Sequence, residues 1–225
     1  MKRFLLTIFF FASFILLHAQ ERQKPIQFSL IGSPHLSWIK SDIKENETGP
    51  LYPGYYAGVE FDYFFRDNYG FSTGINLESK GGSLIYSEEN VLHFDAGADT
   101  MKPGTKIKYH LRYLGIPLGL KFTSKEIGYT TIFADVGLDL LFNTRATATA
   151  TDNNYVKEPV SEEIGLFNIG YHVEGGIQYS FGNNLSLVAG IEYRSTFLDL
   201  TNDRGVDKTD NAYINQIGLK LGLAF

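Results

Sequence analysis

His172 and Glu174 are a pair of residues in this 225-residue chain whose types and spacing could do chemistry. They lie two residues apart in a segment where apolar and polar residues alternate, so an extended strand would point both side chains to one side. An imidazole beside a carboxylate can hold a metal ion or act as a general base. One isolated pair indicates either role only weakly. We therefore expect a hydrogen-bonding role inside the fold, with no metal and no cofactor.

Other ionisable residues occupy the polar positions of similar alternating segments. Together with His172 and Glu174 they form a predicted network of internal charges, namely Glu60, Asp62, Glu78, Lys121, Asp135, Asp139, Glu192, Arg194 and Lys220. Within it we expect Lys121 to pair with Asp135 or Asp139. Arg194 is expected to pair with Glu174 or with the neighbours of Glu192. A path for protons or ions is the alternative use of such a network.

The segments that carry these residues read as β-strands, because apolar residues recur at every second position. Three units consist of two such segments joined by a short turn. They run from Tyr55 to Leu77, from Leu114 to Leu140 and from Phe167 to Tyr193, with turns near Asp67, Lys125 and Asn183. A first strand from about Ile26 to Trp38 and a last one from about Tyr213 to Phe225 bring the total to roughly eight.

The connections between the units are longer and polar. They fall at about Lys40 to Gly54, Lys80 to Thr105, Asn143 to Glu163 and Asp199 to Asn211. Short periplasmic turns alternating with long extracellular loops are typical of small outer-membrane barrels. The pattern predicts an all-β, antiparallel, up-and-down, eight-stranded transmembrane β-barrel with four long extracellular loops, three short periplasmic turns and both ends in the periplasm.

The aromatic residues indicate that the apolar face meets lipid. Large aromatic residues gather beside the short turns, as at Tyr63, Phe65, Tyr69 and Phe71, whereas mid-strand residues are mostly aliphatic. The opposite face is rich in glycine and carries both signs of charge, which fits a narrow interior filled by side chains. A soluble lipocalin-like periplasmic barrel would place its apolar face inside. In mid-strand, Pro117 removes a ladder hydrogen bond and is expected to mark a bulge or a local bend.

The beginning of the chain has the layout of a signal peptide. Lys2 and Arg3 precede an apolar stretch from Phe4 to Leu17, and charged residues begin at Glu21. We expect a signal peptide over residues 1–20, cleaved after Ala19 or Gln20, and an outer-membrane barrel domain over residues 21–225. An uncleaved anchor is the alternative.

Composition excludes several classes of function. The chain has no cysteine, so disulfides, thiolate metal sites and a lipid-anchored cysteine are excluded. Its formal net charge is −5, and it becomes about −7 once Lys2 and Arg3 are removed. Nucleic acid is therefore not an expected partner.

The run Tyr113-Leu114-Gly115-Ile116-Pro117-Leu118-Gly119-Leu120-Lys121 resembles a strand of PorT-like outer-membrane β-barrel proteins. The segments Phe133 to Leu138, Val173 to Tyr179 and Leu219 to Phe225 are similar to later strands of that family. The resemblance implies an eight-stranded outer-membrane barrel, and one member is associated with protein secretion. The final residue, Phe225, resembles the C-terminal signal that the barrel assembly machinery reads.

The function expected from these observations is a small non-enzymatic outer-membrane barrel with a structural, surface-interaction or secretion-accessory role. Its partners would be outer-membrane lipid, the barrel assembly machinery, and surface or secretion-system proteins. In the second loop, the alternation of Ile85, Tyr86, Val91, Leu92 and Phe94 predicts a hairpin above the membrane that could bind a partner by edge pairing.

Two candidate sites lie at the extracellular end, one between the outer end of the fourth strand and the adjacent loop, the other in the last loop. A lipid-modifying enzyme is the main alternative function, with His110 and one of Ser83, Ser87, Asp95 and Asp99 at the outer rim. The acidic segment Asp199, Asn202, Asp203, Asp207 and Asp210 could hold calcium, but it lacks the twelve-residue loop that ends in glutamate, so we expect a solvated loop.

Overall fold

The computed structural model describes residues 25–42, 46–87, 89–95, 97–150, 155–161, 163–182, 184–201 and 211–225. The predicted signal peptide, the turn residue Asn183 and four residues of the candidate calcium segment, Asn202, Asp203, Asp207 and Asp210, lie outside these ranges. Eight long strands form the fold: β1 (Ile26–Ser41), β3 (Tyr52–Arg66), β4 (Tyr69–Ile85), β7 (Lys106–Thr123), β8 (Thr130–Ala150), β10 (Phe167–Ser180), β11 (Ser186–Thr196) and β12 (Ala212–Ala224).

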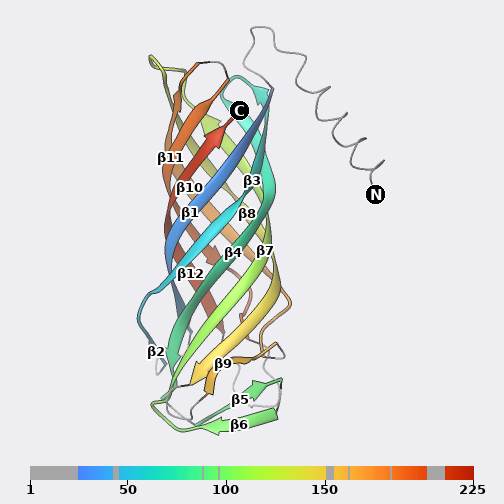
Figure 1. Cartoon of the computed structure of the whole chain (residues 1–225), viewed down its shortest axis with the longest axis vertical. Helices are drawn as coiled ribbons and strands as arrows, with labels where there is room; N and C mark the ends of the chain where they lie inside the picture. Colours follow the sequence, from blue (N-terminus) through green and yellow to red (C-terminus); the bar gives the residue numbers. More distant parts are fainter. Residues whose placement is uncertain are drawn as a thin grey trace, which may run out of the picture.

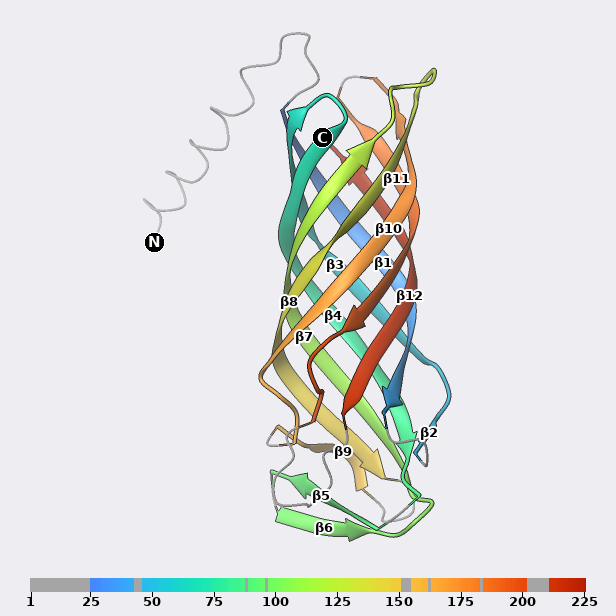
Figure 2. The ribbon, with the colours of Figure 1, turned by 180° about the vertical axis from the view of Figure 1, so that it is seen from behind.

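These eight strands close into a barrel in which every neighbouring pair is antiparallel. Each strand pairs with the next long strand along the chain, and β12 pairs back with β1. Figures 1 and 2 show the strands tilted around a tall cylinder, with the C-terminus and the short turns at one end. The predicted fold class is confirmed. The described residues contain no helix that is long and apolar enough to cross a membrane.

Four short strands lie at the other end of the barrel, which carries the long loops and is therefore the extracellular end. They are β2 (Glu47–Thr48), β5 (Asn90–Phe94), β6 (Gly97–Met101) and β9 (Tyr155–Pro159). β2 pairs with β4 and β9 pairs with β8, whereas β5 and β6 form a two-stranded sheet. Figure 1 shows this sheet lying across the extracellular end.

The alternation of residue types sets the two faces of the wall. On β8, Ile132, Val136 and Leu138 are exposed on the outside, and Asp135 and Asp139 are buried inside. Apolar groups on the outside lower the free energy only where lipid surrounds them, because in water they would form one continuous exposed apolar surface. The outward apolar face thus agrees with a membrane barrel and not with a lipocalin-like one.

Aromatic rings form two belts on this outer face. The belt beside the periplasmic turns contains ring pairs such as Phe65 with Phe71 and Tyr69 with Phe122. A second belt near the extracellular side includes Phe142 with Phe167, whose centroids lie 5.3 Å apart, and Tyr171 with Phe197 at 5.0 Å. The sequence predicted only the first belt. The aliphatic zone between the two belts matches the hydrocarbon core of a bilayer.

Of the bulge or local bend predicted at Pro117, the bulge is not present. Pro117 keeps its register opposite Asp139 on β8, and the β4 ladder skips Pro117 and Ile116 without a register shift. The ladder therefore loses a hydrogen bond but no residue. The bulge between β7 and β8 lies elsewhere: Arg112 faces Arg145 and Tyr113 faces Asn143, so Thr144 is the extra residue.

Two of the predicted loops are largely strand. β4 continues to Ile85 and β8 continues to Ala150, so the barrel wall extends well beyond the lipid-facing zone. The predicted hairpin in the second loop is present as β5 and β6. Lys80, expected at the start of a loop, instead points into the barrel interior, where it is 3% exposed.

Candidate functional site

Arg194 is the centre of a charge network inside the barrel, and β11 points its side chain inward. The guanidinium donates to Asp139 at 2.9 Å, to Glu192 at 3.2 Å and to Glu174. The ring of Tyr56 packs against the guanidinium at 4.7 Å, and its hydroxyl donates to Glu60 at 3.1 Å. The predicted pairing of Arg194 with Glu174 is confirmed.

Lys220 and Lys121 extend the network towards the periplasmic end. Lys220 on β12 donates to both oxygens of Glu60, at 2.7 and 2.8 Å, and to Glu174. Lys121 forms its ion pair with Asp62 on β3, so the predicted pairing with Asp135 or Asp139 is wrong. Lys121 and Asp135 are register neighbours. The lysine reaches past β4 instead, because a flexible four-carbon stem can cross a narrow lumen.

His172 bridges Asp135 and Asp139, the two aspartates with which Lys121 does not pair. Its ring nitrogens lie 3.0 Å from Asp139 and 3.2 Å from Asp135, and neither contacts Glu174. Glu174 faces Arg194 and Lys220 instead, so His172 and Glu174 share a face without forming a site together. Within the described ranges, no group of three or more histidine, aspartate or glutamate residues is arranged to hold a metal ion.

Small residues make room for these charges. Gly119 and Gly137 face each other across β7 and β8. A Cβ at Gly137 would lie 2.2 Å from the Leu118 carbonyl oxygen and 2.8 Å from the His172 ring. A Cβ at Gly119 would lie 2.2 Å from Asp135 Oδ1, so glycine at these two positions leaves room for Asp135 and His172 in the narrow lumen.

Sequence reasoning missed two inward groups. Lys80 pairs with Glu78 at 2.9 Å, with both side chains almost fully buried. His35 on β1 is 5% exposed and lies close to Glu78, Lys80 and Arg194. The alternation of Ser33, His35 and Ser37 with Pro34 and Leu36 is the signal that would have placed His35 inside.

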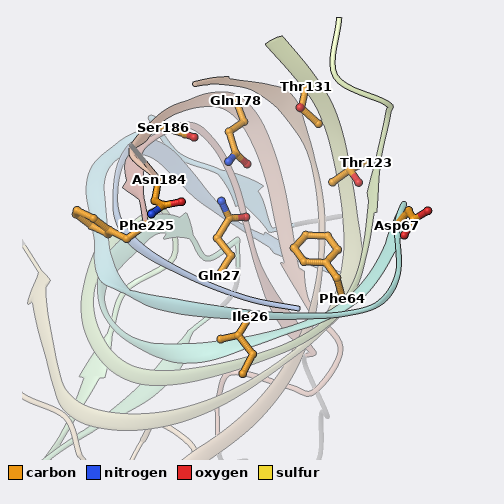
Figure 3. Close-up of a pocket in the computed structure, with 10 residues that line it drawn as sticks. All are labelled: Ile26, Gln27, Phe64, Asp67, Thr123, Thr131, Gln178, Asn184, Ser186 and Phe225. Atoms are coloured by element: carbon orange, nitrogen blue, oxygen red, sulfur yellow. The ribbon is translucent and has the colours of Figure 1, made fainter. Parts of the chain in front are cut away.

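The periplasmic mouth holds a cavity of about 200 Å³. It is lined by Ile26, Gln27, Phe64, Asp67, Thr123, Thr131, Gln178, Asn184, Ser186 and Phe225. Figure 3 shows Gln27, Phe64 and Gln178 pointing into the ring of strands. Above this vestibule lie the charge pairs just described. Phe225 is 48% exposed, and its backbone closes the last hydrogen bonds to Phe28 on β1.

The extracellular end is filled mainly by apolar side chains. Beyond the charge network, inward positions of the wall strands carry Ile39, Leu84, Ile107, Tyr109, Leu111, Ala146, Ala148, Ala150 and Ile214. Leu92, Phe94 and Met101 from β5 and β6 complete this core from above. We call this set, with the β5–β6 sheet that covers it, the outer plug. The lumen therefore ends in an apolar core.

The predicted rim site around His110 is not assembled. His110 lies outside the wall on β7, and its hydrogen bond goes to the Tyr52 hydroxyl. Asp95 accepts from the backbone of Ser161 at 2.7 Å, and Asp99 accepts from Tyr155 at 3.0 Å. Both aspartates thus hold the β5–β6 sheet against the β9 segment. Ser83 faces Lys108 in the ladder. The backbone N–H of Ser87 donates to Asn46 Oδ1 at 3.4 Å.

An apolar outer wall, two aromatic belts and a charged interior together define the class of outer-membrane β-barrel proteins. The family model described as "Outer membrane protein beta-barrel domain" matches residues 18–193. The chain belongs to this family, and its location is the outer membrane. The comparison with curated proteins found no match.

Several solved structures are similar to the chain. Neisserial surface protein A is 15% identical with a TM-score of 0.47, covering 88% of this chain and 95% of that one. The attachment invasion locus protein Ail of Yersinia pestis is 16% identical with a TM-score of 0.41, covering 88% and 98%. OprG of Pseudomonas aeruginosa is 11% identical with a TM-score of 0.44, covering 89% and 94%. These likenesses carry no functional argument.

Proposed function

We propose that this chain is a closed, non-enzymatic outer-membrane barrel that presents its extracellular end to partners at the cell surface. The outer plug is the observation that carries this proposal. A conducting pore needs a continuous polar path, whereas Leu92, Met101 and Ile107 are fully buried across the extracellular end. Moving an ion through such a core would cost several kcal/mol at least, on the order of the penalty for burying an unpaired charge.

The β5–β6 sheet is fixed in place, which supports a role in presenting a defined surface. The backbone of Asp95 donates to the Pro159 carbonyl at 3.0 Å. Phe94 stacks on Tyr155 with centroids 4.3 Å apart. Among the strands that the structure describes, β5 and β6 pair only with each other, so their outer edges are open to strand addition by a partner.

The enzymatic alternative has less support. His110 is hydrogen-bonded to the Tyr52 hydroxyl, and Asp95 and Asp99, the carboxylates of the predicted rim site, bind Ser161 and Tyr155 instead. A nucleophile, a base and an orienting acid in mutual contact would be needed for ester hydrolysis or acyl transfer.

We also propose a narrower family and a route of export for this chain. The strand Tyr113 to Lys121 supports membership of the PorT-like group, with a secretion-accessory role as one form of surface interaction. The predicted signal peptide over residues 1–20 supports export across the inner membrane of a Gram-negative cell, followed by insertion through the assembly machinery with Phe225 as its signal.

Planar-bilayer recording of the full-length folded protein tests closure. The wild type is expected to show no steady conductance, because the outer plug blocks the lumen. The variant Leu92→Asp with Met101→Asp should produce flickering openings, and Val156→Asp, on an exposed position of β9, should stay silent. A steady open channel in the wild type would overturn the proposal. Release of fatty acid from phospholipid or lipid A by the purified wild type would overturn its non-enzymatic part.

A further inference from the structure

Five side chains on the outside of β7, β8 and β9 form a basic patch beyond the lipid-facing zone. They are Lys108, His110, Arg112, Arg145 and Lys157, and we call them the outer basic cluster. The four permanent cations are exposed, and all four lie close enough to His110 to act on its charge. Positive charge therefore gathers at one place on the extracellular wall.

Arg112 and Arg145 oppose each other directly across the β7–β8 ladder, and both are exposed on the outer face. Like charges in directly opposite positions repel and destabilise a strand pair. The ion pairs among the described residues lie in the lumen, and none involves either arginine. A bound anion between the two guanidinium groups would turn this repulsion into attraction.

The acidic residue nearest in sequence does not compensate the cluster. Glu158 follows Lys157 on β9, but it pairs with Ala148, whose side chain points into the outer plug. Paired residues on neighbouring antiparallel strands point to the same face, so Glu158 faces inward. Lys157 has a left-handed backbone with φ 55°. Its backbone N–H donates to Thr149 Oγ1 at 3.0 Å, which holds β9 against β8 at this residue.

The height of the cluster identifies the kind of anion. The next outward pair towards the membrane is Leu114 with Phe142, and Phe142 belongs to the extracellular aromatic belt. A strand rises about 3.3 Å per residue, so Arg112 lies about 7 Å beyond Leu114 along β7. Aromatic belts mark the membrane–water interface. The paired guanidinium groups therefore stand at the level of the lipid headgroups.

We propose that the outer basic cluster binds the phosphorylated headgroup of the anionic glycolipid of the outer leaflet, lipopolysaccharide. Two guanidinium groups side by side suit a phosphate, because each can donate two parallel hydrogen bonds to its oxygens. Lys108 lies about 13 Å further out, four residues along the strand, and meets anionic groups nearer the sugar core. Its ammonium is held over the Tyr52 ring at 5.0 Å.

Continuity with the lipid-facing wall favours a membrane-anchored ligand over a soluble phosphate. Leu114 and Phe142 directly below the arginine pair can contact acyl chains while the headgroup meets the cluster. A ligand held in the outer leaflet is also presented at this height at high local concentration.

Native mass spectrometry of the full-length barrel in mild detergent, titrated with lipid A, tests the proposal. The double variant Arg112→Gln with Arg145→Gln should bind lipid A about tenfold or more weakly, since both charge-assisted contacts to the phosphate are lost. The matched control Arg66→Gln with Lys125→Gln removes the same charge from exposed positions at the periplasmic turns and should bind like the wild type. Equal binding by the double variant and the wild type would overturn the proposal.

Two further arms identify the ligand. Dephosphorylated lipid A should bind the wild type as weakly as lipid A binds the double variant, and undiminished binding would overturn the role of the phosphate. Soluble inorganic pyrophosphate should compete poorly with lipid A. Competition at an affinity equal to that of lipid A would overturn the inference that the ligand is anchored in the membrane.

Folding of each variant is checked by heat-modifiable gel migration. Arg112→Lys with Arg145→Lys serves if the glutamine pair does not fold. It keeps the charge but loses the planar fork, so we expect weaker binding than in the wild type. Binding as tight as in the wild type would contradict the proposed contact of the two guanidinium groups with the phosphate.

Discussion

At the residue scale, Arg194 is the side chain on which the interior depends most. Replacing it with alanine leaves Asp139, Glu174 and Glu192 buried without this partner. Breaking a buried ion pair from one side costs about 3–5 kcal/mol, so Arg194→Ala should lower the free energy of unfolding by that order. Urea titration in lipid vesicles measures it. The exposed Arg145→Ala should change the same quantity by about 0.5 kcal/mol or less. Equal effects of the two variants would contradict the network.

His110 reports on the outer basic cluster through its pKa. It stands on the extracellular part of β7, beyond the last lipid-facing residue Leu114. Partial burial of the ring lowers its pKa below the ordinary 6.5, and Arg112, Lys157, Arg145 and Lys108 lower it further. His110 is therefore neutral at pH 7. Arg112→Gln with Arg145→Gln should raise the pKa, because two repelling cations are gone. NMR titration of the labelled imidazole measures this, and an unchanged pKa would show that the arginines lie too far away.

Which residues face inward could be predicted from the sequence, whereas their partners could not. Period-two alternation fixes the face, so Glu60, Asp135 and Lys220 were correctly placed inside. Partner choice depends on which strands meet across the lumen and how far a side chain reaches. Lys121 therefore pairs with Asp62, not with its register neighbour Asp135.

At the scale of the element, the extra residue Thr144 lets β8 serve two environments. Before it, even-numbered residues such as Leu138 and Phe142 face lipid; after it, Ala146 and Ala148 face the outer plug. Its hydroxyl donates to the Arg112 carbonyl at 3.1 Å, which holds the bulge. The sequence did not reveal this extension because Thr144 to Thr151 contains only small and polar residues besides Arg145, a composition typical of loops.

Deleting Thr144 should exchange the inward and outward faces of the last residues of β8. A one-residue shift moves every following side chain to the opposite face, so Ala146 and Ala148 would leave the outer plug. We expect the barrel to remain heat-modifiable while the β5–β6 sheet becomes sensitive to external protease on whole cells. Deleting Asn154, outside the described strands, is the control and should leave the sheet protected. If the β5–β6 sheet stayed protected from protease in the Thr144 deletion, the proposed role of the bulge in directing Ala146 and Ala148 inward would be contradicted.

At the scale of the whole molecule, the chain is divided along its axis into a polar vestibule, a charged lumen and an apolar plug. The outside is divided in parallel into an aromatic belt, an aliphatic zone, a second belt and a basic cluster. Closure, strand number and orientation followed from alternation and loop length. The plug did not, because its side chains come from positions far apart in the sequence, such as Ile39, Leu92 and Ile214.

The most direct test of this account is a spin-label scan of β8 in lipid vesicles, which the absence of native cysteine makes straightforward. Single cysteines from Ile132 to Ala148 would be labelled, and collisions with oxygen and with a water-soluble nickel complex measured. We predict high oxygen accessibility at even positions up to Phe142, a change of phase at Thr144, nickel accessibility at Arg145, and protection from both reagents at Ala146 and Ala148. Oxygen accessibility at Asp135 and Asp139, or one unbroken phase through Ala148, would contradict the account.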